Sequence, residues 1–359
     1  MKKIFALALA LSLSLSLAAC GNNSGSGSGT TPPPADNSSS ADKSGGTTTT
    51  PAPANNITLK LGFSTNEEDP RALGAKQFKE EVESKTNGAV TIEIYPSGQL
   101  GGDADLINSI SLDSGTVDII ITDASNFATY EPKMGISALP FQFADFEEAW
   151  AFMDSDVEAE AEAGLIPQNM RVLAHYCNGF RCVTNSKGPV ESPDDMKGML
   201  IRTPENPVIM ATMTAMGANP QPLAFNELYQ ALNQGTYDAQ ENPIPVIYNN
   251  NLYEVQEYLS VTNHIYSGMC FTIAESSWNK LSADQQTIVA DAAKASADYD
   301  RELNAQMTDD LVSSLEEAGM KINNPDLAPF AEATSSVLTD NAATYGDLLD
   351  KLAAWKANR

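Results

Sequence analysis

The chain has 359 residues and a formal net charge of −26 at pH 7, and 42% of its residues are hydrophobic. This length is enough for a large core and two lobes. The acidic balance argues against nucleic-acid binding, which needs a basic face, and against adhesion to an anionic membrane surface.

The first twenty residues predict a targeting segment. Two lysines follow the initial methionine, and the apolar stretch over 4–17 is too short for a comfortable transmembrane helix. The sequence LAAC at 17–20 then resembles a bacterial lipobox. We therefore expect a lipoprotein signal peptide over 1–20 and lipidation at Cys20, which would anchor the protein to a membrane without spanning it. An ordinary secretory signal with a chance cysteine is the alternative.

Residues 21–56 contain Gly, Ser, Thr, Pro and Asn with few apolar side chains, which predicts a disordered tether. The remaining chain alternates strand and helix patterns, as parallel βαβ units do. We expect strands over 57–63, 90–96, 117–123, 171–174, 182–184, 199–202 and 237–240. We expect helices over 70–87, 106–111, 145–150, 192–198, 207–216 and 227–233, another after Pro243, and a long one over 276–319. The long helix has no internal proline or glycine and is expected to bridge two lobes or pack along both.

Two arginines stand out because each follows apolar residues where a strand is expected to end. Arg181 follows NGF at 178–180, and Arg202 follows MLI at 199–201. A guanidinium presents a planar fork of donors that matches a carboxylate. Two such forks from neighbouring strands favour a pocket for a small organic anion. The alternative is that each arginine reaches into water or pairs with one of the many acids.

The spacing of cysteines and histidines predicts no metal site. The chain has no CxxC pair and no Cys/His metal-ligand spacing. Three cysteines remain beyond the lipobox, and we expect all of them to be buried apolar side chains: Cys177, Cys182 and Cys270. A bulge at 178–179 could bring the first two within bridging distance. His175 and His264 are expected to be structural or exposed rather than catalytic.

Seven motifs, in order, resemble the solute-binding proteins of tripartite ATP-independent periplasmic (TRAP) transporters, the DctP-like family. The similarity runs from about residue 58 to about residue 326. The motifs are YPSGQLG at 95–101, ALPF at 138–141, NGFR at 178–181, MKGMLIRTP at 196–204, GANPQP at 217–222, DAQENP at 238–243 and EVQEYL at 254–259. The sixth motif usually reads DGQENP, so Ala239 is a conservative departure.

The resemblance implies a two-lobed, periplasmic-binding-protein-like α/β fold with a long helix spanning both lobes. The lobes would close on a ligand. We expect lobe I to comprise 57–178 and 268–307, and lobe II to comprise 179–267 and 308–359.

The resemblance also implies a ligand site. Arg202 matches the arginine expected to clamp the ligand carboxylate, and Arg181 matches an arginine that also reaches the ligand in sialic-acid-binding members. The other residues implied as ligand contacts are Phe225, Asn242, Asp123 and Ser64. A hydrophobic staple is the alternative for Phe225, and satisfaction of a turn is the alternative for Asn242.

These features predict an extracytoplasmic, lipid-anchored protein that captures a small organic acid, such as a sugar acid or a dicarboxylate. The resemblance implies delivery of this acid to the small and large membrane subunits of a TRAP permease. The alternative is a receptor that presents its ligand to a membrane sensor kinase. An enzyme is not expected, because the chain lacks G-x-S-x-G, H-E-x-x-H, P-loop and dinucleotide-binding motifs. We expect a monomer without cofactor or metal.

Overall fold

The computed structural model describes residues 56–359. The predicted signal peptide, lipidation at Cys20 and tether lie outside the described residues, apart from the last tether residue. Every helix within 56–359 is either too short or too polar to cross a bilayer.

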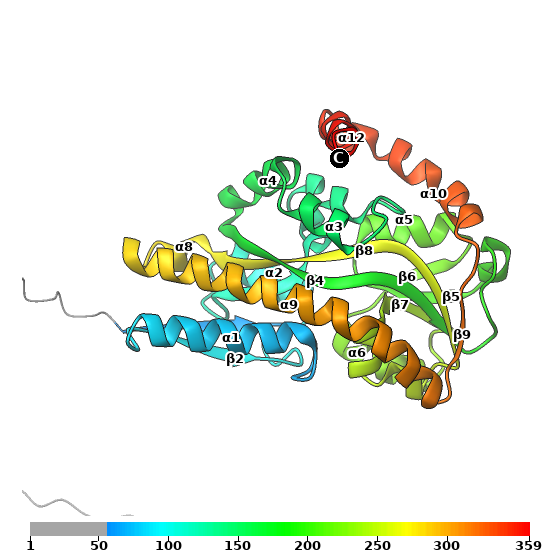
Figure 1. The fold of residues 1–359 in the computed structure, drawn as a ribbon, viewed down its shortest axis with the longest axis horizontal. Coiled ribbons are helices and arrows are strands. Elements are labelled where there is room, and N and C mark those ends of the chain that lie inside the picture. The colour runs from blue at the N-terminus through cyan, green and yellow to red at the C-terminus, as the bar shows by residue number, and fades with distance from the viewer. Residues whose placement is uncertain (1–55) are drawn as a thin grey trace, which may run out of the picture. The chain divides into compact units, whose positions relative to one another are not determined.

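A mixed sheet of nine strands forms the centre of the described part of the chain (Figure 1). Its order is β2-β1-β3-β8-β4-β7-β5-β6, and β9 pairs with β8. Parallel pairing of β1 with β2 and β3, and of β5 with β6 and β7, confirms the predicted βαβ pattern. The strands are β1 (Ile57–Gly62), β2 (Val90–Tyr95), β3 (Ile119–Asp123), β4 (Met170–Asn185), β5 (Leu200–Thr203), β6 (Asn219–Pro222), β7 (Ala239–Pro243), β8 (Tyr258–Ala274) and β9 (Lys321–Asn323).

The long strands β4 and β8 join the two parallel groups through antiparallel pairing. The expectation of two short strands at 171–174 and 182–184 was wrong, because both belong to the 16-residue β4. Three irregularities shift its register against β8, and such bulges interrupt the alternation by which a strand is recognised in a sequence. Arg181 therefore lies inside a strand and not at its end. The two arginine-bearing strands are not neighbours either, since β7 lies between β4 and β5.

Helices cover both faces of the sheet (Figure 1). One hydrophobic cluster packs α1 and α9 against the first strands, and another contains residues of α3, α4 and α5. The helices are α1 (Pro70–Lys85), α2 (Asp103–Ser111), α3 (Phe146–Met153), α4 (Asp156–Glu162), α5 (Pro207–Ala215), α6 (Phe225–Asn233), α7 (Ile244–Asn249), α8 (Glu275–Trp278), α9 (Ala283–Glu317), α10 (Ala328–Asp340), α11 (Ala342–Tyr345) and α12 (Leu348–Ala357).

The helix predicted over 276–319 is interrupted after α8. Ser282 begins α9 with a capping box, in which its backbone N donates to Gln285 Oε1 at 2.9 Å and its Oγ accepts from Gln285 N at 3.3 Å. The resulting 35-residue helix packs against α1 and β4, and further along against α7. A helix that contacts both halves of the sheet fits a two-lobed fold. The described residues form one compact unit, which does not test where one predicted lobe ends and the other begins.

Candidate functional site

All six residues predicted to contact a ligand border one narrow pocket of about 40 Å³. They are Ser64, Asp123, Arg181, Arg202, Phe225 and Asn242. Part of this wall also borders a wider cavity of about 640 Å³. The wider cavity is within the size range of small-molecule sites, and we refer to both parts together as the cleft. The fold thus gathers side chains from the segment after β1 and from β3, β4, β5, α6 and β7 at one place.

Arg202 lies at the carboxyl end of β5 and is 2% exposed. Its Nε donates to the Leu223 carbonyl oxygen at 2.8 Å, and its guanidinium carbon lies 5.9 Å from the centre of the Phe225 ring. No carboxylate of residues 56–359 lies within ion-pairing distance of it. Burial lowers the pKa of Arg202 to about 10, which still leaves the side chain charged at pH 7. A buried cation without a partner is costly, and an anion in the cleft would compensate it.

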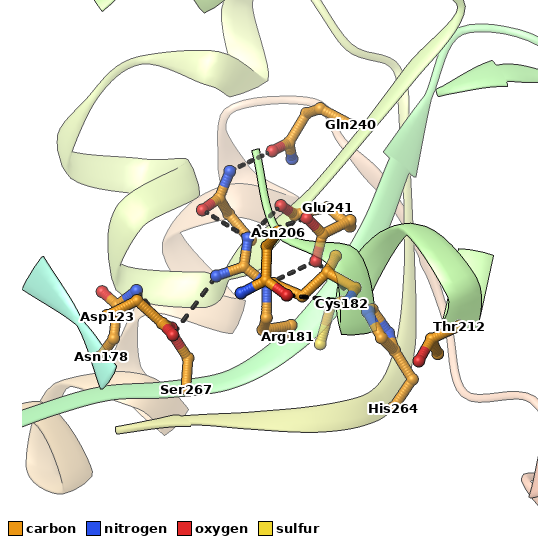
Figure 2. Close-up of polar contacts among 12 residues, drawn as sticks. Asp123, Asn178, Arg181, Cys182, Asn206, Thr212, Gln240, Glu241, His264 and Ser267 are labelled. Carbon is orange, nitrogen blue, oxygen red and sulfur yellow. Dashed lines mark hydrogen bonds and ion pairs between the residues drawn. The ribbon is translucent and has the colours of Figure 1, made fainter. Parts of the chain in front are cut away.

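Arg181 is also buried, but it already has a carboxylate partner (Figure 2). Its Nη2 donates to Glu241 Oε1 at 2.9 Å and to the Glu241 carbonyl oxygen at 2.8 Å, and its Nε donates to Glu241 Oε2. Burial disfavours both charges, yet their attraction raises the pKa of Arg181 and lowers that of Glu241. The ion pair that the sequence left open as an alternative is therefore present. Its charge is balanced before any ligand arrives.

The pair is embedded in a wider network (Figure 2). Arg181 Nη2 also donates to Asn242 Oδ1 at 3.1 Å, and its Nη1 donates to Ser267 Oγ at 3.3 Å. Ser267 Oγ in turn donates to Asp123 Oδ2, so the network also includes a side chain of β3, which pairs with β8. His264 Nε2 lies 3.3 Å from Glu241 Oε2. Asn242 and Asp123 are thus held by protein partners while they border the cleft.

Phe225 is the first residue of α6, and Ala224 is the N-cap. The predicted helix over 227–233 would have its cap at Asn226, which would have made Phe225 the residue before the cap and suited it to a hydrophobic staple. With the observed start, the ring instead faces the Arg202 guanidinium. Ser64 directly follows Phe63 after β1 and borders the narrow pocket.

Sequence reasoning missed a third buried arginine in the pocket wall. Arg71 is 4% exposed, its Nη2 donates to Asn178 Oδ1 at 3.1 Å, and its Nε lies 3.6 Å from Asp69 Oδ1. The signal that could have found it is its place as the second residue of α1. A cation is disfavoured at a helix N-terminus by the helix dipole, so an arginine there calls for another reason.

Three more polar side chains in the cleft wall were missed. Each has a buried oxygen without a hydrogen-bond partner in residues 56–359: Thr65 Oγ1, Asp103 Oδ1 and Asn126 Oδ1. Buried polar atoms are nearly always paired. All three of these oxygens belong to residues that border the cleft.

Comparison with known proteins gives this cleft a context. A model of the family described as "Bacterial extracellular solute-binding protein, family 7" matches residues 61–344. The chain is 33% identical over 284 residues to the 2,3-diketo-L-gulonate-binding periplasmic protein YiaO of Escherichia coli strain K12, covering 79% of this chain and 86% of YiaO.

Two solved structures of TRAP periplasmic solute-binding proteins are also similar. One, from a Polaromonas species, is bound to D-erythronate; it shares 32% identity with a TM-score of 0.80, covering 83% of this chain and 97% of that one. The other, from Sulfurospirillum deleyianum, has bound succinate; it shares 30% identity with a TM-score of 0.79, covering 83% and 99%.

Proposed function

The chain belongs to family 7 of the bacterial extracellular solute-binding proteins, and on that premise we propose that it binds a sugar acid with one carboxylate, held by Arg202. As a member of this family it is a TRAP-type solute-binding protein and not an enzyme. The related proteins named above take a diketo sugar acid, an erythronate or a succinate. Two classes of ligand are therefore candidates for this protein: polyhydroxy monocarboxylates and dicarboxylates.

The charges around the cleft support a ligand with one carboxylate. Arg181 is balanced by Glu241, and Arg71 lies beside Asp69, whereas Arg202 has no acidic partner among the described residues. The carboxylates of Asp103 and Asp123 also border the narrow pocket. A second ligand carboxylate would face these acids, and the remaining arginine of the pocket wall, Arg71, already lies beside Asp69.

The unpaired oxygens support a ligand that carries hydroxyl groups. The carboxylate of Asp103 and the amide oxygen of Asn126 can only accept hydrogen bonds, and Thr65 Oγ1 can accept as well as donate. The hydroxyls of a sugar acid supply donors to these atoms. A dicarboxylate supplies acceptors alone and would leave the protein oxygens unpaired.

Calorimetry with D-erythronate, L-galactonate and succinate tests this proposal. Leaving two buried acceptors unpaired costs about 2 kcal/mol, so the better sugar acid is expected to bind at least about 30-fold more tightly than succinate. Equal or tighter binding of succinate would contradict the proposed ligand class.

The fold supports a further part of the proposal, closure of lobe I (57–178 and 268–307) on lobe II (179–267 and 308–359). The closed form would then hand the acid to the small and large membrane subunits of a TRAP permease. Small-angle scattering should show a smaller radius of gyration once a sugar acid is bound. An unchanged radius would argue against closure.

We also propose that the protein is anchored through a lipid on Cys20, outside the cytoplasm. The lipobox at 17–20 supports this. Cys20→Ser is expected to move the protein from the membrane fraction to the soluble fraction. A variant that remains with the membrane as the parent does would contradict the anchor.

A further inference from the structure

A second group of buried polar side chains lies outside the cleft, between α4 and the sheet. Glu158 and Glu162 are four residues apart on α4 and so lie on one face of that helix. His175 of β4 and Cys270 of β8 are paired in register, so their side chains point to the same face of the sheet. Glu162, His175 and Cys270 each offer one atom that could bind a metal, and these atoms lie within 4.8 Å of one another.

The two ring nitrogens of His175 have different carboxylate neighbours. Nε2 is hydrogen-bonded to Glu162 Oε1, inside the cluster. Nδ1 lies 3.1 Å from Asp154 Oδ1, on its other side. Asp154 is itself fixed by Arg301, whose Nη1 and Nη2 donate to its two oxygens at 2.7 and 2.9 Å. A carboxylate on the far nitrogen of a histidine is the arrangement that orients histidine ligands of metal ions.

Glu158 gives an independent indication that a partner is missing from this cluster. Its side chain is fully buried, and neither carboxyl oxygen has a hydrogen-bond partner in the described part of the chain. Burial raises the pKa of Glu158 well above its usual value, and the neighbouring Glu162 raises it further. A buried carboxyl group with both oxygens unpaired is rare, and a cation would satisfy it.

We propose that Glu162, His175 and Cys270 form a binding site for one zinc ion, and that the unpaired Glu158 carboxyl group turns toward the ion as its fourth ligand. Sulfur, nitrogen and carboxylate oxygen are the donors that Zn²⁺ takes in four-coordinate sites, whereas Ca²⁺ and Mg²⁺ prefer oxygen alone. Tetrahedral zinc holds its ligand atoms about 3.3–3.8 Å apart. The ion would therefore enter by separating His175 Nε2 from Glu162 Oε1, which are hydrogen-bonded to each other. Binding would release the Cys270 thiol proton, the proton shared on Nε2 and any proton held by the Glu158 carboxyl group.

Such an ion would tie α4 to the two long strands. Cys270 also pairs with Thr122 of β3, the residue before Asp123 in the cleft wall. Zinc would thus stiffen the part of the scaffold from which β3 presents its side chains. The four ligands come from a helix and two strands that are distant in the sequence. The spacing of these residues along the chain therefore does not predict the site. This site is independent of the proposed sugar-acid function.

Cobalt substitution in the purified full-length protein tests the proposal. After treatment with a chelator, one equivalent of Co²⁺ is expected to give tetrahedral absorption bands and a sulfur-to-cobalt charge-transfer band, and Zn²⁺ should displace them. Cys270→Ala should abolish the sulfur band, and Cys177→Ala, which removes another buried thiol outside the cluster, should retain it. Asp154→Asn changes the partner of His175 Nδ1, and with it the ion pair to Arg301, and should weaken metal affinity about 10–100-fold.

Glu158→Gln keeps the shape of the side chain and provides a test that does not depend on a cysteine change. It should weaken cobalt binding at least 10-fold while the protein remains folded by circular dichroism. Absence of cobalt uptake at micromolar concentration, or a sulfur band that survives Cys270→Ala, would overturn the proposal. Either result would mean that the four side chains form a hydrogen-bonded network only.

Discussion

Two arginines border the same pocket, and they differ in what balances their charge. Arg181, in the middle of β4, is paired with Glu241 on the adjacent β7. Arg202, at the end of β5, donates to a backbone carbonyl and faces an aromatic ring, with no acid of residues 56–359 paired to it. An arginine with its own carboxylate belongs to the folded framework, whereas one without leaves its charge for a ligand.

The largest expected effect is on stability at the paired arginine. Arg181→Ala leaves the Glu241 carboxylate buried without its partner, so the free energy of unfolding should fall by about 3–5 kcal/mol. Denaturant unfolding without ligand measures this. Arg171→Ala is the matched control, because it removes an ion pair with Glu275 that is partly exposed and should cost under about 1 kcal/mol. Equal losses of unfolding free energy in both variants would contradict the claim that Arg181 supports the fold whereas Arg202 binds the ligand.

The next effect is on affinity at the unpaired arginine. Arg202→Ala should lower affinity for the sugar acid by about 2–5 kcal/mol, because it deprives a desolvated carboxylate of its partner. Arg202→Lys should recover little, since an ammonium lacks the planar fork. Without ligand, Arg202→Ala should unfold at the same denaturant concentration as the parent or higher. Marked destabilisation of the ligand-free variant would show that Arg202 supports the fold instead.

A buried acid differs from these buried arginines, because it can bind a proton and become neutral, whereas an arginine stays charged. Asp300 of α9 is fully buried; its Oδ2 accepts from Cys177 N at 2.7 Å, and its Oδ1 is unpaired in the described residues. Burial raises the pKa of Asp300 well above its usual value. The folded protein therefore holds a proton that the unfolded chain releases above pH ~4, and stability falls as pH rises from there toward the folded-state pKa.

Asp300→Asn removes this dependence while retaining an oxygen acceptor. The variant should gain stability relative to the parent as pH rises from about 4 to 7, by at least about 1 kcal/mol, which corresponds to less than one pKa unit. Unfolding curves across this range provide the measurement. If the free energy of unfolding differs between variant and parent by the same amount at every pH, the raised pKa of Asp300 would be contradicted.

The smallest effect concerns an unpaired hydroxyl in the cleft wall. Thr65→Val removes Oγ1 at nearly constant volume and should cost about 1 kcal/mol of sugar-acid affinity. Succinate affinity should not change. Thr272→Val is the control, since Thr272 is also buried with an unpaired Oγ1 but does not border the cleft. The role of Thr65 would be excluded by equal effects on both ligands.

Local sequence patterns predicted part of the strand arrangement and the position of one of the two arginines. The apolar run before Arg202 correctly placed it at the end of β5, and the strand–helix alternation predicted the parallel pairs. The bulges in β4 hid a continuous strand, so the position of Arg181 was misread. Its partner Glu241 is 60 residues away and becomes adjacent only through the β4–β7 register. Pairing across a sheet is a tertiary property, which residue spacing along the chain does not encode.

The most direct test of the central claim is a thermodynamic cycle between Arg202 and the ligand carboxylate. Calorimetry would compare wild-type protein and Arg202→Ala, each with a tightly bound sugar acid and with its uncharged amide. If Arg202 holds the carboxylate, the two changes should be coupled by about 2 kcal/mol or more, since each removes the same interaction. Losses that add to within about 0.5 kcal/mol would show that the carboxylate binds elsewhere and contradict the account.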